Sequence, residues 1–266
     1  MIRAFFGIEQ YPFSRENIIL LKHQQEVYDT LKVHCQQGGL CLVMGEPGTG
    51  KTIIKDAIKN NADKRMIVVS VGRTMHTYTN TLKILCEAFN IEQDGTHFRC
   101  EKRLIEEAVA LKREGKMLIN IIDEAHLMDM ETMRKLRLMF EEFPENHNII
   151  LIGQPYLLFN MSLKINEDIK SRITYSTTML KLNNDDMQQF ILAQLDKLNL
   201  GHNIFTQDAL SLIVRSADGI IRRCRNLCLS CMLEAVRARK KNIDIDIVNR
   251  VLIQPHWRNQ YDIENN

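Results

Sequence analysis

The chain has 266 residues, of which 45% are hydrophobic and only five are proline, a composition that supports one large domain or two smaller ones and excludes long disordered linkers. The formal net charge of +2 excludes a bulk attraction to nucleic acid, so any affinity for DNA requires a local basic patch. No stretch reaches the roughly 18 continuous apolar residues of a membrane span, which predicts a soluble, cytoplasmic protein with no membrane partner.

Four apolar runs in the first part of the chain are typical of buried parallel strands. They cover residues 40–44, 66–71, 117–122 and 148–153. Segments with helical periodicity lie between them, at residues 52–60, 79–89 and 100–115. This alternation predicts an α/β domain with a mostly parallel sheet over residues 1–180.

Residues 181–266 lack the strand pattern and are predicted to form a small all-helical domain with a short C-terminal tail. Helical periodicity covers residues 185–198, 206–217, 222–240 and 244–253, with Asp185 and Thr206 as expected N-cap residues. Three of the seven cysteines, at positions 224, 228 and 231, share one face of the third helix. We expect them to pack as small buried residues, because no second pair of ligands with zinc-site spacing accompanies them.

The stretch GEPGTGKT directly follows the first predicted strand and precedes a predicted helix, and it matches the phosphate-binding pattern G-x-x-x-x-G-K-[ST]. Glycines in such a loop let backbone N–H groups approach phosphates, the lysine neutralises the β and γ phosphates, and the threonine hydroxyl ligates Mg²⁺. The loop therefore predicts binding of ATP with Mg²⁺ by Gly45, Glu46, Pro47, Gly48, Thr49, Gly50, Lys51 and Thr52.

A second polar signal, Asp123-Glu124, follows the apolar run at residues 117–122. In a protein with a phosphate-binding loop, an aspartate at the end of a strand can hold Mg²⁺ through water. The adjacent glutamate can polarise the water that attacks the γ-phosphate. We therefore predict that Asp123 is a magnesium-binding residue and that Glu124 is catalytic, as is Lys51, which indicates ATP hydrolysis and not binding alone.

Together, these two motifs and the trailing helices resemble an AAA+ ATPase, with the loop as Walker A and the Asp-Glu pair within Walker B. Within that superfamily the sequence is similar to the ExeA branch, which also contains the TnsC and TniB transposition ATPases. The stretches that carry this resemblance are FFGIEQYPFS, HQQEVYDTL, GEPGTGKT, IIDEAHLM, LIGQP and GIIRRCRNLC. The resemblance implies a P-loop base domain followed by a helical lid.

Three further residue roles are implied by this resemblance. Gln154, in LIGQP, stands where relatives carry a polar sensor of the γ-phosphate, although Asn or Thr is the commoner residue there. Arg172 resembles an arginine finger that reaches a neighbouring subunit's nucleotide, and a plain surface arginine is the alternative. Arg222 resembles the lid arginine that returns to the γ-phosphate; Ile221 replaces the usual proline before it, so Arg223 is a second candidate.

The role implied by the resemblance is ATP-dependent regulation of DNA transposition. ATP sites shared between subunits imply a homo-oligomer, either a ring or a helical filament, that assembles on double-stranded DNA and recruits or activates a transposase. An ExeA-like ATPase for secretion-system assembly is the alternative. Because those relatives continue into a transmembrane segment and a periplasmic domain, and this sequence stops at residue 266, we expect the transposition role. A helper ATPase for replication or repair is a third possibility.

Three basic groups are candidates for contacting DNA phosphates without reading bases. One is Arg73 with Thr74 and His76, a second is Lys102-Arg103, and a third lies at residues 134–137. For each group taken alone, a solvated helix face is the favoured alternative. Trp257, the single tryptophan, is expected either to anchor a partner or to pack against the helical domain.

Overall fold

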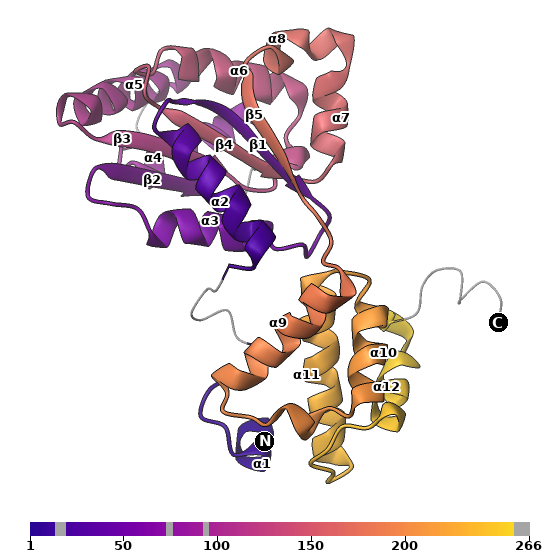
Figure 1. The fold of residues 1–266 in the computed structure, drawn as a ribbon. Helices are drawn as coiled ribbons and strands as arrows, with labels where there is room; N and C mark the ends of the chain where they lie inside the picture. Colours follow the sequence, from indigo (N-terminus) through magenta and orange to yellow (C-terminus); the bar gives the residue numbers. More distant parts are fainter. Residues whose placement is uncertain (14–19, 73–76, 93–95, 258–266) are drawn as a thin grey trace. The chain divides into compact units, whose positions relative to one another are not determined.

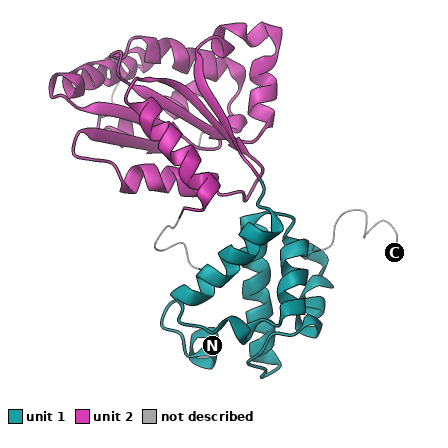
Figure 2. Cartoon of the chain, viewed as in Figure 1, with its two compact units in different colours: residues 1–17, 181–266 teal, residues 18–180 magenta. Residues whose placement is uncertain are grey.

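The computed structural model describes residues 1–13, 20–72, 77–92 and 96–257. It divides into two compact units (Figure 2). Residues 18–180 form the first, here called the sheet unit, and residues 1–17 together with 181–266 form the second, here called the helical unit.

The sheet unit is built on five parallel strands in the order β2-β3-β4-β1-β5 (Figure 1). The strands are β1 (Gly39–Gly45), β2 (Met66–Val71), β3 (Met117–Ile122), β4 (Asn148–Gly153) and β5 (Ile173–Met179). The four apolar runs form strands at the predicted positions, which confirms the α/β fold with a parallel sheet. Strand β5 was not predicted from the sequence, because this edge strand alternates between half-buried and exposed residues and is rich in threonine.

Helices cover both faces of this sheet, and each face has its own apolar core. The helices are α2 (Lys22–Cys35), α3 (Lys51–Asn60), α4 (Tyr78–Ala88), α5 (His97–Arg113), α6 (Met130–Glu141), α7 (Tyr156–Ser162) and α8 (Glu167–Lys170). One core packs Leu42 and Leu118 against α4, α5 and α6, while the other packs Val43 and Ile121 against α2 and α3. Alternate strand residues therefore serve opposite cores, which explains why the strands read as continuous apolar runs.

The helical unit contains α1 (Ile2–Phe6), α9 (Asn184–Lys197), α10 (Gln207–Ala217), α11 (Ile221–Arg237) and α12 (Ile245–Leu252). Thr206 caps α10 as expected, because its side chain accepts a hydrogen bond from the Ala209 N–H. The N-cap of α9 is Asn183 and not Asp185, since the Asn183 side chain accepts from the Asp186 N–H. No helix among the described residues is long and apolar enough to cross a membrane.

The N-terminal segment groups with the helical unit, which differs from the expected division at residues 1–180 and 181–266. Helix α1 contacts α11, and the Arg225 guanidinium donates from Nε to the Phe13 carbonyl over 2.9 Å. Phe13 is 3% exposed. These contacts are tertiary and carry no periodicity, so the sequence pattern could not assign the segment to its unit.

Candidate active site

The loop between β1 and α3 has a backbone that depends on glycine. Gly48 and Gly50 adopt φ values of 90° and 105°, a left-handed region that other residues rarely enter. At Gly45 an added Cβ would lie 2.7 Å from the Thr49 hydroxyl oxygen and 2.9 Å from the Met179 Cβ. The loop is thus closed tightly on itself, with its backbone N–H groups next to the start of α3, the arrangement that binds phosphate.

Lys51 is the first residue of α3 and is only 8% exposed. Its ammonium donates to the carbonyl oxygens of Gly45, at 2.6 Å, and Glu46, at 2.9 Å. A buried ammonium requires such partners, because burial of an unpaired charge is costly. The loop therefore holds a positive charge in place among its own carbonyl groups.

Asp123 lies directly after β3, with its side chain 10% exposed. One carboxylate oxygen is 2.6 Å from the Lys55 ammonium, and the other accepts from the Glu124 N–H at 2.9 Å. Lys55 was not identified from the sequence. Its position one turn after Lys51 on α3 was the available signal, because residues four apart share a helix face.

The residues at this edge are suited to a magnesium ion. Carboxylate and hydroxyl oxygens are the ligands that Mg²⁺ prefers. Thr52 precedes Lys55 by three residues on α3, and the Lys55 side chain reaches Asp123, so Thr52 shares the helix face directed toward that carboxylate. Thr52 and Asp123 are thus the candidate ligands.

Glu124 and Gln154 follow the neighbouring strands β3 and β4, and one histidine lies between their side chains. Glu124 has φ 53° and ψ 34°, a left-handed conformation that is unfavourable for a residue with a side chain. His126 places Nδ1 3.5 Å from the Glu124 carboxylate and Nε2 2.9 Å from the Gln154 amide nitrogen. His126 lies within the stretch IIDEAHLM, but no role for it was predicted from the sequence.

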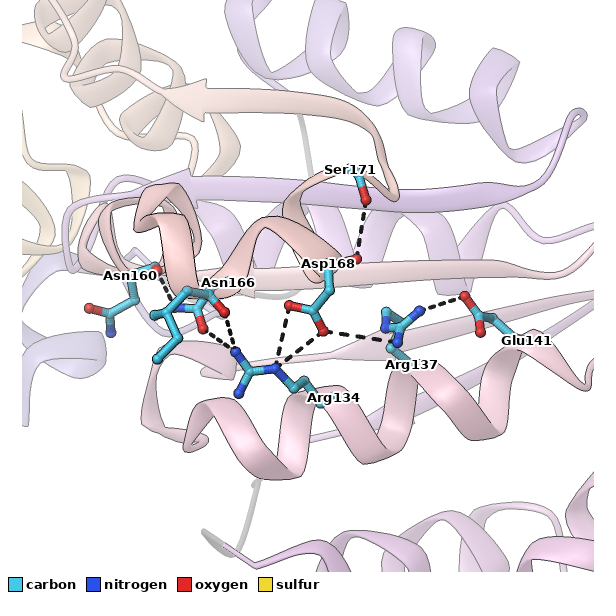
Figure 3. A network of polar contacts seen from close by, with 8 residues as sticks. Arg134, Arg137, Glu141, Asn160, Asn166, Asp168 and Ser171 are labelled. Atoms are coloured by element: carbon cyan, nitrogen blue, oxygen red, sulfur yellow. Dashed lines mark hydrogen bonds and ion pairs between the residues drawn. The ribbon is translucent and has the colours of Figure 1, made fainter.

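A network of polar contacts joins α6 to the segment around α8 (Figure 3). Arg134 donates from Nε to the Asp168 carboxylate at 3.2 Å, and from Nη2 to the Ile165 carbonyl and the Asn166 side chain, each at 2.6 Å. Arg137 pairs with Glu141 at 2.6 Å. Exposed ion pairs of this kind contribute modestly to stability. The contacts of Arg134 with the Ile165 carbonyl and the Asn166 side chain also hold the turn before α8 against α6.

Arg172 lies two residues after the end of α8 and is exposed. Its Nη2 lies 3.2 Å from the Glu141 carboxylate, and 60% of its side chain is accessible. The same carboxylate oxygen accepts from Arg137, so Glu141 joins Arg172 to the network in Figure 3. Arg172 therefore stands at the surface of the sheet unit with its guanidinium held by one carboxylate.

The proposed DNA contacts change in light of this network. Arg134 and Arg137 are bound to Asp168 and Glu141, Lys135 pairs with Glu131 at 2.7 Å, and the 134–137 run is therefore not a free basic patch. The Lys102 ammonium lies 3.7 Å from the Glu106 carboxylate. The remaining candidate group, Arg73 with Thr74 and His76, falls outside the described residues.

Arg222 and Arg223, the two lid candidates, differ in their surroundings within the helical unit. Arg222 is exposed in the first turn of α11. Arg223 is partly buried and donates to the Trp257 carbonyl over 3.4 Å. Trp257 itself is 9% exposed, so it packs against the helical unit and does not project as an anchor for a partner.

The amino-acid sequence of the chain is similar to those of known proteins. Residues 33–161 match the family described as AAA domain. The chain is 26% identical over 258 residues to general secretion pathway protein A of Aeromonas hydrophila. That match covers 93% of this chain and 47% of the relative, so the chain spans about half of that protein's length.

Several solved structures have a fold similar to that of this chain. Cdc6p from Pyrobaculum aerophilum aligns with a TM-score of 0.70 at 15% identity, over 91% of this chain and 68% of that one. ORC2 of Aeropyrum pernix in ADPNP and ADP complexes gives 0.67 at 16% identity, over 99% and 74%. Drosophila ORC bound to DNA gives 0.68 at 17% identity, over 99% and 67%. The chain thus has a Cdc6/ORC-like AAA+ fold.

Proposed function

We propose that this chain, which carries an AAA domain within an AAA+ ATPase fold, hydrolyses ATP at the carboxyl edge of its sheet. The observation that carries the proposal is the gathering of Lys51, Asp123 and Glu124 at the ends of β1 and β3, where the phosphate-binding loop begins. In parallel sheets this edge is where ligands bind. The structure of a fold relative with ADPNP and ADP supports nucleotide as the ligand.

Each residue has a part in this proposal. The backbone of residues 45–50 cradles the phosphates. The Lys51 ammonium, which donates to the two loop carbonyls, donates to phosphate oxygens when nucleotide binds. Thr52 and Asp123 hold Mg²⁺, which supplies positive charge against the phosphate oxygens when bound. Glu124 orients the attacking water and accepts its proton, and Gln154 contacts the γ-phosphate.

We further propose that two arginines complete the site. Arg172 is exposed on the sheet unit and its guanidinium is paired with the Glu141 carboxylate, so a neighbouring subunit's phosphate can replace that carboxylate. Arg222, exposed at the start of α11, is the lid arginine, because Arg223 already donates to the Trp257 carbonyl. This assignment makes the active form a homo-oligomer in a ring or filament.

The proposed use of ATP is assembly on double-stranded DNA without sequence preference, in regulation of transposition. The DNA part is supported by a fold relative, Drosophila ORC, whose structure was solved bound to DNA. The transposase partner rests on the sequence resemblance. In this role ATP binding joins subunits along the duplex, and hydrolysis releases them.

An ATPase of the secretion-protein type is the second candidate. It is favoured by the 26% identity to general secretion pathway protein A, which extends over 93% of this chain. The secretion-type role fits this sequence match at least as well as the transposition role does. A secretion-type ATPase would act on a protein partner and would not need DNA.

Binding to duplex DNA separates the two candidates. Purified protein is mixed with labelled duplexes of two unrelated sequences, with ATP, ADP or no nucleotide, while affinity and particle size are recorded together. We expect large ATP-dependent assemblies on both duplexes that weaken as salt rises. Lys51→Ala is the matched control and should not assemble. Absence of DNA binding in every nucleotide state would favour the secretion-type role.

A further inference from the structure

His126 connects the two residues that the proposed mechanism places at the γ-phosphate. It lies in the short helical turn at Ala125–Leu127, one residue after Glu124. Its ring has the Glu124 carboxylate on one side and the Gln154 amide on the other, at the distances given above. The side chain is only 10% exposed, whereas that of Glu124 is 51% exposed.

The chemistry of the two neighbours selects one form of the ring. A carboxylate is an acceptor, so the nitrogen that faces Glu124, Nδ1, is best matched when it carries the proton. In a neutral ring Nε2 is then an acceptor, and the Gln154 amide nitrogen lies 2.9 Å from it as a donor. The three side chains form a chain of donors that runs from Gln154 through His126 to Glu124.

The contact between His126 and Glu124 is longer than the contact between Gln154 and His126. The 3.5 Å between Nδ1 and the carboxylate exceeds an ordinary hydrogen bond, and Nδ1 is buried with no hydrogen-bond partner within the described chain. A buried donor without a partner is unfavourable, so a small movement of Glu124 toward the ring is favoured. Catalytic hydrogen bonds are often long before substrate binds.

The backbone around His126 is adapted to this placement. Gly153, at the end of β4, lies so close to His126 that an added Cβ would be 3.3 Å from the His126 backbone nitrogen and 3.5 Å from the His126 Cβ. Glu124 bends the chain through its left-handed conformation and so turns the backbone toward the end of β4. Both features bring the ring against the strand that carries Gln154.

We propose that His126 is a positioning residue that orients Glu124 for attack and links this orientation to the contact of Gln154 with the γ-phosphate. The inference deepens the proposed ATPase function and rests on it. When Gln154 engages phosphate, its amide shifts, the ring follows, and Nδ1–H closes on the carboxylate. Glu124 is then held in the direction from which it accepts the proton of water.

The test compares four chains by steady-state ATP turnover and by binding of a fluorescent ATP analogue, with and without duplex DNA. His126→Ala should lower kcat on the order of 10- to 100-fold, as misplacement of a catalytic group does, and leave nucleotide affinity within about twofold. His126→Asn places an amide donor near the position of Nδ1 and should recover most of the turnover. His202→Ala, on an exposed histidine of the helical unit, is the matched control and should behave as wild type.

A second arm distinguishes positioning from structural damage. In a Glu124→Gln background, His126→Ala should cause no further loss of the residual turnover, because the group that it orients is already removed. An equal fold loss in both backgrounds, or wild-type turnover of His126→Ala, would overturn the inference and leave the ATPase proposal intact. A wild-type chain without any ATP turnover would overturn both.

Discussion

The two units of the chain differ in what they bury. Among the described residues, nine polar or charged ones are buried, and all of them lie in the sheet unit: Gln24, Thr49, Lys51, Thr81, Asn120, Asp123, Thr132, Asn148 and Asn166. The described part of the helical unit buries only apolar residues and cysteines. Because a buried polar group requires partners or a function, this difference is consistent with the proposed catalytic residues lying in the sheet unit.

The largest expected effect tests whether the sheet unit acts alone or across subunits. Arg172→Ala should lower ATP turnover on the order of 10³-fold, the size expected when an arginine that neutralises the transferring phosphoryl group is lost. Binding of ATP to the monomer should be unchanged. Turnover is measured at rising protein concentration, with Lys170→Ala as the control; this lysine is the last residue of α8, two residues before Arg172, and lies 3.7 Å from the Glu167 carboxylate.

Mixing sharpens this prediction further. Lys51→Ala subunits retain Arg172 and lack a working loop, whereas Arg172→Ala subunits have the reverse defect. A mixture should therefore recover turnover if the arginine acts in trans. A mixture as inactive as its components would place the arginine finger elsewhere.

A smaller effect is expected when a polar group is added to the apolar core of the helical unit. Cys228 is fully buried on α11, and burial raises the pKa of its thiol, which stays protonated at neutral pH. Cys228→Ser should lower the free energy of unfolding by about 1 to 3 kcal/mol, because the hydroxyl is more costly to bury than the thiol. Urea denaturation measures the loss. An unchanged midpoint would mean that this core tolerates polar groups and would weaken the contrast between the units.

The reverse substitution is expected to stabilise the sheet unit slightly. Asn120 is fully buried in β3, and neither polar atom of its side chain has a hydrogen-bond partner in the described chain. Asn120→Val should raise the free energy of unfolding by about 1 kcal/mol in the same denaturation experiment, because it removes two unpaired groups. Asn148→Val is the matched control and should destabilise, since the Asn148 amide donates to the Cys35 carbonyl at 2.8 Å. A loss of stability in Asn120→Val would indicate a buried water bound to its amide.

Sequence patterns predicted most of the sheet unit because its elements are periodic and its loop chemistry is local. Buried strands read as apolar runs, and glycines and a lysine define the phosphate-binding loop within eight residues. Strand β5 was missed because its sequence alternates and is rich in threonine, whereas most other missed features depend on contacts between distant segments. Lys55 and Asp123 are brought together from α3 and β3, His126 and Gln154 from the ends of β3 and β4. The contacts of α1 and Phe13 with α11 are of the same kind.

The charged residues on α6 show what charge along the sequence leaves out. The sequence of residues 134–137 is a basic run, and charge alone favours a nucleic-acid contact. The structure places Asp168 and Glu141 against these arginines (Figure 3). Glu141 lies four residues after Arg137 on α6 itself, so that pair can be read from the sequence, whereas Asp168 comes from α8 and a count of positive charges along the chain could not include it.

The most direct test of the account is ATP turnover and ATP retention by wild type and Glu124→Gln, measured side by side with labelled ATP and gel filtration. Removing the general base should lower turnover by about 10²- to 10⁴-fold while the protein still binds ATP and remains in its assembled state. This result would place hydrolysis at the end of β3. Wild-type turnover in Glu124→Gln would contradict the account, because the carboxylate beside Asp123 would then have no part in the reaction.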